Sequence, residues 1–492
     1  MAKNGQNYRK SKKMYKQTIL SALLLSSIIS FSQEIVNSTP VTLKKDRDVF
    51  QIVNNAEKET TLFISDKVKV KAIRLDEKMQ IIDSVSAERP DTKTFSQMIG
   101  YNTNESNPRL FWSSNDFKKI HTQLYNFNDR KTTTQEYHLP LKDERFLQKF
   151  SENKKLYILT ILKNSNTLKL YVFDNEGKLE EKSIELTGFH FFKSTDYKKT
   201  NLYGVLGENL LPFEPPFSLQ EINTEDPTSL TYSAKRRKCY SDDKKITLTI
   251  DTNFDYSQLI IINLEDYTAS EKIIKKPYLT YELKSDLNSN SFLIDNKLYQ
   301  IKSSPEKVVL TLKDLDDNLI KEYSAAGDIP IAFKNSDIIQ ENGSPGSQRT
   351  LENTSQFIRK VNNLNSGVSC YQIGKNNLIT LGSVSEVRDS NSQILGQFGA
   401  IGALVAVAIS NPSMDSFNSY ANRKVVKIDC LLDKDFNHIK GEVQPLAFDK
   451  IRNFFDKNRD VSSQTLFKMD SLYYLGYYDN KTKEYIIRKF AD

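Results

Sequence analysis

Four short runs of alternating apolar and polar residues recur along this chain. Two segments show the pattern clearly, one over residues 147–186 and the other over residues 291–325. In both, short turns rich in Asn, Asp, Lys, Ser and Gly separate the runs. A period of two predicts β-strands, and short polar turns predict that successive strands pair antiparallel. Each segment is therefore predicted to be a four-stranded antiparallel sheet, with strands A to D in chain order.

The same pattern of strands A to D fits seven units of the chain. The turn between C and D carries an Asp in six of them: Asp76, Asp129, Asp174, Asp266, Asp316 and Asp433. Where nothing intervenes, these residues lie about 45 to 53 positions apart. Asp favours tight turns because its side chain bonds to its own backbone, so the recurrence has a structural cause. The chain is thus predicted to be a repeat of one sheet unit.

A period in this range with four strands per unit resembles the β-propeller superfold. The resemblance covers most of the chain but points to no named family. The Gly-His and Trp-Asp pattern of WD repeats is absent, as are the paired glycines of kelch repeats, and Trp112 is the only Trp. The resemblance implies an all-β, seven-bladed β-propeller. Six to eight blades remain open, because residues 187–236 have room for another unit. A β-sandwich or two β domains is the alternative.

The two ends of the chain predict how the propeller closes. The last unit, from Thr465, supplies strands A, B and C and then the chain stops, whereas residues 34–45 form a spare strand-like segment before the first unit. Pairing the spare strand with the last unit removes an exposed sheet edge. We therefore expect closure by an N-terminal strand.

Four long segments interrupt the frame. Three connect D of one unit to A of the next (187–236, 326–367 and 444–464), and one connects B to C (388–423). In an up-and-down sheet of four strands, these two kinds of connection leave the same end. The insertions are therefore predicted to project from one face, and loops on a rigid scaffold commonly carry function.

Residues 1–32 are predicted to be a secretory signal peptide. A basic stretch precedes the apolar run TILSALLLSSIIS, and Ser30 and Ser32 occupy the positions before a cleavage site at Gln33. The leader resembles those of exported Gram-negative proteins, which implies a periplasmic or outer-membrane location. The mature protein is then residues 33–492. The leader holds six of the 69 basic residues, which leaves 63 basic against 62 acidic, so we expect no nucleic-acid partner.

The insertion 388–423 contains an apolar segment, residues 394–410, and no charged residue lies between Asp389 and Asp415. Leaving its eight large apolar side chains in water would cost about 12–24 kcal/mol, so we expect the segment to be buried. It packs on its own propeller, on a partner protein or in a membrane. A full membrane crossing is the least suited of these, because the sixteen residues 394–409 rise only about 24 Å as a helix, against a membrane core of about 30 Å. The residues predicted to contact a partner or membrane are Phe398, Ile401, Leu404, Val405, Phe213 and Phe217.

The sequence offers no catalytic motif. The four His residues are scattered, so no metal site is predicted, and neither catalytic residues nor cofactors are assigned. Cys370 and Cys430 are predicted to lie two strands apart, which disfavours a disulfide between them. We therefore expect Cys239, Cys370 and Cys430 to be buried free thiols.

These features favour an exported, non-catalytic interaction protein that contacts a cell-envelope protein through its insertion-bearing face. Two alternatives remain. One is an enzyme or binding protein that acts on glycan or peptide in the central pocket, and the other is a protein held to a membrane by residues 394–410.

Overall fold

The computed structural model describes residues 33–41, 48–194, 196–280, 287–342, 348–387, 411–421 and 423–492. The predicted leader (1–32) and the apolar segment 394–410 lie outside the described residues, and so do Phe398, Ile401, Leu404 and Val405.

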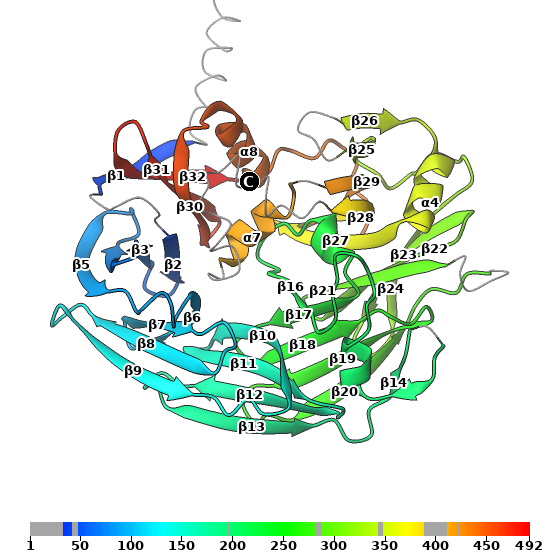
Figure 1. Ribbon diagram of the computed structural model, residues 1–492. Helices are drawn as coiled ribbons and strands as arrows, with labels where there is room; N and C mark the ends of the chain where they lie inside the picture. The colour runs from blue at the N-terminus through cyan, green and yellow to red at the C-terminus, as the bar shows by residue number, and fades with distance from the viewer. Residues whose placement is uncertain are drawn as a thin grey trace, which may run out of the picture.

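Seven sheets of four or five strands follow one another around a central axis in chain order (Figure 1). Neighbouring sheets touch through their A strands, for example β2 with β30 and β6 with β10, so strand A of each sheet lies nearest the axis. The protein is therefore an all-β, seven-bladed β-propeller, which confirms the predicted fold. The stretch 187–236 forms no eighth blade in its described residues; it is an insertion between the third and fourth blades.

The strands of the first three blades are β2 (Asp48–Asn54), β3 (Glu59–Ser65), β4 (Lys69–Leu75) and β5 (Ile81–Glu88); β6 (Gln97–Asn104), β7 (Asn107–Ser113), β8 (Lys119–Asn126) and β9 (Lys131–His138); and β10 (Glu144–Glu152), β11 (Lys155–Leu162), β12 (Thr167–Phe173) and β13 (Leu179–Glu185). The fourth and fifth contain β17 (Arg237–Ser241), β18 (Lys245–Ile250), β19 (Tyr256–Asn263) and β20 (Ala269–Lys275), then β21 (Asn288–Ile294), β22 (Lys297–Ser303), β23 (Lys307–Asp314) and β24 (Leu319–Ala326). The sixth contains β27 (Asn365–Ile373), β28 (Asn376–Val387), β29 (Arg423–Leu432), β25 (Ile338–Asn342) and β26 (Gln348–Leu351), and the seventh contains β30 (Val461–Met469), β31 (Leu472–Asp479), β32 (Glu484–Ala491) and β1 (Glu34–Pro40).

The insertions carry the helices and the remaining short strands: β14 (Phe191–Phe192), β15 (Lys199–Thr200), α2 (Leu202–Leu206), β16 (Gln220–Glu221), α3 (Leu230–Ser233), α4 (Thr354–Asn363), α7 (Pro412–Asn418) and α8 (Ala447–Lys457). Phe448, Ile451 and Phe454 of α8 pack on the seventh blade in one apolar cluster that also includes Phe417 of α7. The insertions 187–236 and 388–423 leave the face at which A strands begin, because D-to-A and B-to-C connections share that end of each blade.

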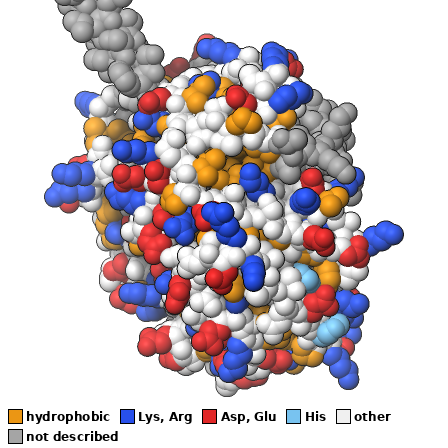
Figure 2. All heavy atoms as spheres, turned by 90° about the vertical axis from the view of Figure 1, so that its left-hand side faces the viewer, with side chains coloured by type: hydrophobic (Ala, Val, Ile, Leu, Met, Phe, Trp, Pro, Cys, Tyr) orange, Lys and Arg blue, Asp and Glu red, His pale blue; other side chains and the backbone are white. Residues whose placement is uncertain are grey.

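Burial explains why the inner strands are so apolar. β11 is buried along almost its whole length, because both faces of a blade pack against neighbouring blades. The outer strands β5, β9 and β13 are mostly exposed and polar. Figure 2 shows one side of the molecule, where Lys, Arg, Asp and Glu side chains are interspersed. The regular strand pattern thus comes from packing between blades.

Four of the six Asp residues of the C-to-D turns, Asp76, Asp174, Asp266 and Asp433, accept hydrogen bonds from the turn backbone as predicted. Asp76 Oδ1 accepts from the amides of Lys78 and Gln80, and Asp433 Oδ1 accepts from Asp435 and Asn437. In the second blade the acceptor is Asn126, whose Oδ1 atom accepts from the amides of Asn128 and Asp129. In the fifth blade the acceptor is Asp314, at the end of β23, and Asp316 is one of its donors. The recurrence therefore has the structural cause that the sequence indicated.

The N-terminal strand closes the propeller as predicted. β1 pairs antiparallel with β32, from Glu34 opposite Lys489 to Pro40 opposite Glu484. An ion pair joins the Lys489 Nζ and Glu34 Oε2 atoms at 2.6 Å. The outer edge of the last blade is thereby covered.

The sixth blade differs from the sequence prediction. The segment after Asp433 was expected to supply strand D, but only an isolated bridge joins Leu432 to His438. Strand D is β25, which precedes the blade's other strands in the chain and pairs with β29 between residues 424 and 427. Farther along the same edge, the Asn335 amide donates to the Asp429 carbonyl (2.7 Å). The edge of β29 is thus already occupied by a segment that was predicted to be part of an insertion.

The cysteines are buried free thiols. Cys370 and Cys430 both lie opposite Ile379, one on each neighbouring strand. Two strand spacings separate them by about 9–10 Å, beyond the reach of a disulfide.

Arg237 anchors the insertion 187–236. Its side chain is fully buried, and Nε forms an ion pair with Glu214 Oε1 at 3.0 Å. Its terminal nitrogens donate to the carbonyls of Leu206, Glu208 (3.2 Å) and Pro215 (3.0 Å). The insertion therefore wraps around one guanidinium group at the start of β17.

Candidate central binding cavity

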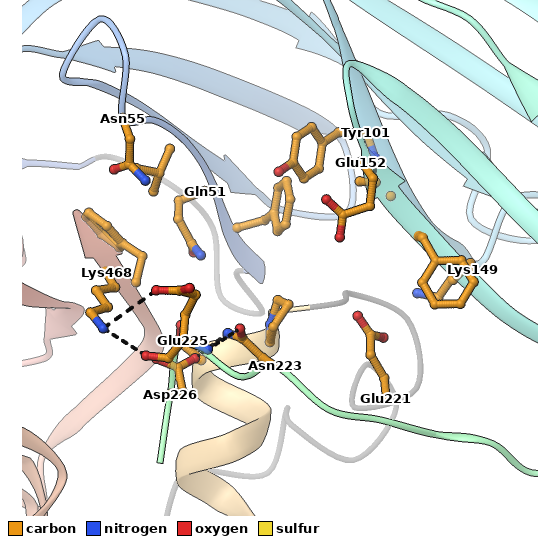
Figure 3. A pocket seen from close by; sticks show the side chains of 18 of the residues that line it. Gln51, Asn55, Tyr101, Lys149, Glu152, Glu221, Asn223, Glu225, Asp226 and Lys468 are labelled. Atoms are coloured by element: carbon orange, nitrogen blue, oxygen red, sulfur yellow. Dashed lines mark hydrogen bonds and ion pairs between the residues drawn. The ribbon is translucent and has the colours of Figure 1, made fainter. Parts of the chain in front are cut away.

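A cavity of about 300 Å³ lies at the centre of the ring (Figure 3). Four A strands form its walls, namely β2, β6, β10 and β30. The wall residues come from the middle and ends of these strands and from the turns that follow, such as Asn55 and Asp470, so the cavity lies toward the face opposite the insertions. Its remaining wall comes from two insertions, through residues 221–226 and the start of α7.

Local structure explains how these insertion segments reach the axis. β16 pairs parallel with β17 and so adds a short strand on the axial side of the fourth blade, which brings Glu221 to the cavity. Asn411 caps α7 by accepting from the Met414 amide (3.1 Å), and its Nδ2 atom donates to Gln51 Oε1 (3.1 Å) and Thr465 Oγ1 (2.7 Å). These bonds attach α7 to the first and seventh blades.

Aromatic side chains form part of the wall. Phe50 and Tyr101 lie with ring centroids 5.6 Å apart, and Phe150 and Phe467 line the cavity as well. Burial and the nearby carboxylate of Glu152 raise the pKa of Tyr101 to about 12. Its phenol is therefore neutral at physiological pH.

Several carboxylates face the same space. Figure 3 shows Glu152 and Glu221 pointing toward one another across it. Burial raises the pKa of Glu221 to about 7, with the nearby Glu152 acting in the same direction and Lys149 opposing it. Burial also raises the pKa of Glu152, although Ser241 Oγ donates to its Oε1 atom at 2.7 Å. Both carboxyl groups hold protons more tightly than in water.

Lys149 and Asp415 belong to the same charge cluster. Burial lowers the pKa of the Lys149 ammonium, against the opposing effect of Glu221 and Asp415. Burial and the charge of Glu221 raise the pKa of Asp415 to about 7. Three segments distant in the sequence thus bring these titratable groups together.

Asp226 is the most deeply buried carboxylate of the cavity. Asn223 Nδ2 donates to its Oδ2 atom (2.5 Å), whereas its buried Oδ1 atom accepts no well-formed hydrogen bond within the described part of the chain. Burial raises the pKa of Asp226 to about 6, while the hydroxyls of Ser413 and Tyr473 lie near enough to act in the opposite direction. An unsatisfied buried oxygen at a cavity wall is a position where a ligand donor would be stabilising.

Two other cavity carboxylates have cationic partners. Lys468 Nζ lies 3.9 Å from Glu225 Oε2 and donates to the Glu225 carbonyl at 2.8 Å. Lys58 Nζ lies 3.9 Å from Asp470 Oδ2. Lys468 also acts on Asp226. Lys149, the other lysine of the described cavity lining, acts on Glu221.

The two sequence-predicted contact residues that the structure describes, Phe213 and Phe217, are not among the residues that line the cavity. Phe217 is half-buried against its own chain, 4.7 Å from the Tyr203 ring and 5.9 Å from the Arg145 guanidinium, measured to ring centroids. Phe213 is half-buried in the same insertion. Contact of these two residues with a partner stays a prediction, as does that of Phe398, Ile401, Leu404 and Val405. Sequence reasoning missed the cavity residues; the polar run 220–226 within an insertion rich in Pro and Phe was the available signal.

Two further properties concern the described residues alone. They contain no group of three or more His, Cys, Asp or Glu arranged to hold a metal ion. None of their helices has the length and apolar character needed to cross a membrane.

No protein-family model and no curated protein matches this chain. Among solved structures, it is similar to an oligogalacturonate lyase in complex with manganese, with 8% identity and a TM-score of 0.34 over 91% of this chain and 90% of that one. An uncharacterized protein from Listeria monocytogenes has 12% identity and a TM-score of 0.30 over 91% and 96%. A Bacteroides fragilis protein whose name describes it as exported has 13% identity and a TM-score of 0.24 over 81% and 94%. These similarities are too distant to indicate a ligand or an activity.

Proposed function

We propose that this protein is an exported binding protein that holds a small polar ligand in its central cavity. The cavity carries the proposal, because its walls combine aromatic rings with buried polar groups, among them an Asp226 Oδ1 atom that accepts no well-formed hydrogen bond from the described residues. Ligand sites in proteins are typically concave, largely apolar and equipped with a few convergent polar groups. A buried carboxylate with a raised pKa lowers the stability of the protein when it ionises. Such groups are commonly retained because they belong to a functional site.

A blocking substitution tests the cavity. Asn55 is an exposed residue at its rim, so Asn55→Trp would fill the space with little effect on the core. Asn128→Trp, in an exposed turn of the second blade, is the matched control. A thermal-shift screen against monosaccharides, amino acids, amines and dicarboxylates should give compounds that stabilise the wild type and Asn128→Trp but not Asn55→Trp. Stabilisation that persists in Asn55→Trp, or the lack of any stabilising compound, would contradict the proposal.

The same screen separates binding from catalysis. A carboxyl group such as Glu221, whose pKa lies near 7, also suits a general acid. If a cavity-dependent compound, glycan or peptide is converted to product, the protein is an enzyme and the binding proposal is wrong.

Export rests on the predicted leader. Mass spectrometry of the protein purified from envelope fractions should give a mature N-terminus at Gln33. A protein that keeps residues 1–32 and stays in the cytoplasm would contradict export.

Docking of a cell-envelope protein on the insertion-bearing face is a second candidate. Tyr278 and Ile329 favour it, because they follow strand D of the fourth and fifth blades with 85% and 72% of their surface exposed. Replacing both with Ser, or replacing Phe398 and Ile401 with Ser, should abolish capture of one defined partner, whereas Asn128→Trp should retain it. Alkaline carbonate should release the protein from envelope preparations unless residues 394–410 hold it in the membrane.

A further inference from the structure

The charge balance of the central cavity indicates the chemistry of its ligand. Five carboxylates line the cavity, against two lysines. Lys468 and Lys58 account for Glu225 and Asp470. Asp226 shares the charge of Lys468 with Glu225, Lys149 faces Glu221 and Asp415, and Asp415 of α7 adds a further carboxylate beside Glu221. When these groups are ionised, the cavity carries an excess of negative charge.

Hydrogen bonding within the protein leaves part of this charge unsatisfied. Asp226 is completely buried, and its Oδ1 atom accepts no well-formed hydrogen bond from the described residues, although the hydroxyls of Ser413 and Tyr473 lie near the carboxyl group. Asn223 and Asp226 bond to one another within the segment 221–226, and this bond fixes the orientation of the unsatisfied oxygen (Figure 3). An N–H donor from a ligand would satisfy an acceptor that is costly to leave unpaired.

The aromatic walls have the same preference. Phe50, Tyr101, Phe150 and Phe467 line the same space as the carboxylates. Aromatic faces attract cations, most strongly where water is excluded. A site that combines carboxylates with aromatic faces discriminates against anions and favours a cation with an organic body.

We infer that the central cavity recognises a small organic cation, a primary amine or a guanidinium, with Glu221 and Asp226 as its counter-ions and the aromatic rings around its carbon chain. This inference rests on the proposed function. A volume of about 300 Å³ is at the small end of ligand pockets, so the ligand is a small metabolite or a single side chain of a larger molecule.

The affinity of the cavity for a cation should depend on pH, because Glu221 and Asp226 bind protons. Burial raises the pKa of Glu221 to about 7 and that of Asp226 to about 6, so both are largely protonated at pH 5 and ionised at pH 8. A cation binds the ionised form, and its binding in turn favours deprotonation. The affinity for a cation should therefore increase about tenfold or more from pH 5 to pH 8.

Isothermal titration with agmatine, putrescine, 1,4-butanediol and succinate tests the inference. The two cations should bind the wild type at pH 8, whereas the neutral diol and the dianion of similar length should not. Glu221→Gln and Asp226→Asn should each weaken the binding of cations about tenfold or more, because each removes a charged acceptor. Glu322→Gln, on the exposed outer strand β24, is the control and should leave the affinity unchanged.

The outcomes separate this inference from the proposed function. If neutral compounds or dicarboxylates bind in a manner blocked by Asn55→Trp while agmatine and putrescine do not bind, the cavity is a binding site and the cation assignment is wrong. If the cations bind Asn55→Trp as tightly as the wild type, they bind elsewhere and the inference fails. If the charge variants do not fold, wild-type affinity at pH 5 and pH 8 decides, and affinity that is independent of pH would overturn the role of Glu221 and Asp226.

Discussion

Removing the Arg237 guanidinium should release the insertion 187–236 from the fourth blade. The guanidinium is completely buried and donates to the Glu214 carboxylate and to the carbonyls of Leu206, Glu208 and Pro215. The amides of Arg236 and Arg237 also donate to the Glu214 carboxylate, at 2.8 and 2.9 Å. Arg237→Met keeps much of the side-chain length and leaves all of these acceptors without their cationic donor.

The magnitude follows from two costs. Removing one partner of a buried ion pair destabilises a protein by about 3–5 kcal/mol, because the remaining charge stays buried. Each carbonyl left without a donor adds up to about 1–3 kcal/mol, less where water reaches it. The Glu214 carboxylate retains its two amide donors, which offsets part of the first cost. We therefore expect Arg237→Met to lower the free energy of unfolding by at least about 4 kcal/mol.

The loss should be local as well as global. Urea unfolding measures the change in stability, and hydrogen exchange of the amides over residues 205–215 measures release of the insertion. Arg130→Met is the matched control, because Arg130 pairs with Asp83 at 3.4 Å while its side chain is 74% exposed. Its substitution should cost less than about 1 kcal/mol. An equally small change in Arg237→Met, with unaltered hydrogen exchange in the insertion, would refute the anchoring role.

Three further predictions concern the cavity, the closure and the sixth blade. Glu221→Gln should make the protein more stable at pH 8 by about 1–3 kcal/mol and leave its stability unchanged near pH 4. Because burial raises the pKa of Glu221 to about 7, the wild-type protein loses stability as the pH rises from about 4.5 to 7, and the Gln variant does not. Urea unfolding at both pH values measures the difference. Deleting residues 33–41 should expose the edge of β32 and cause aggregation and a lower melting temperature, seen by size-exclusion chromatography and thermal unfolding. Gly382→Ala should destabilise the sixth blade by about 2–3 kcal/mol in urea unfolding, because a Cβ atom at Gly382 would lie 1.9 Å from the carbonyl oxygen of Val426.

Each of these expectations has a contradicting result. Equal stability of Glu221→Gln and the wild type at pH 8 would mean that burial of the ionised Glu221 carboxylate costs no stability. A monomeric deletion variant with an unchanged melting temperature would mean that β1 contributes nothing to closure. An unchanged urea midpoint for Gly382→Ala would mean that β28 and β29 can separate at no cost.

The repeat made most of the fold predictable. Inner strands such as β11 and β22 are buried on both faces between blades, so their sequences keep a strong apolar pattern, and the turn Asp residues mark the register. The repeat also predicted how the propeller closes. Because each unit has four strands, the last unit lacks one strand, and the extra strand at the N-terminus supplies it.

Long-range pairing explains what the sequence did not reveal. β25 takes the edge of β29 by placing Gln340 opposite Val426, and nothing in residues 338–342 distinguishes an outer strand from an insertion. The cavity had the same difficulty. Lys149, Glu221 and Asp226 come from an inner strand and an insertion, and a chain with 62 acidic residues offers no local pattern that selects those facing the axis.

The pairing of β1 with β32 sets the order in which the ring can be completed. Glu34 lies opposite Lys489, so the first strand of the described chain has no permanent neighbour until the last has been synthesised. Contacts between such distant residues form late and slowly, because a long loop must close before they contribute. Six blades can therefore assemble before β32 is available, but the seventh forms only once β32 can pair with β1. During that interval β1 is an unpaired strand, and a factor that binds extended segments would act on it then.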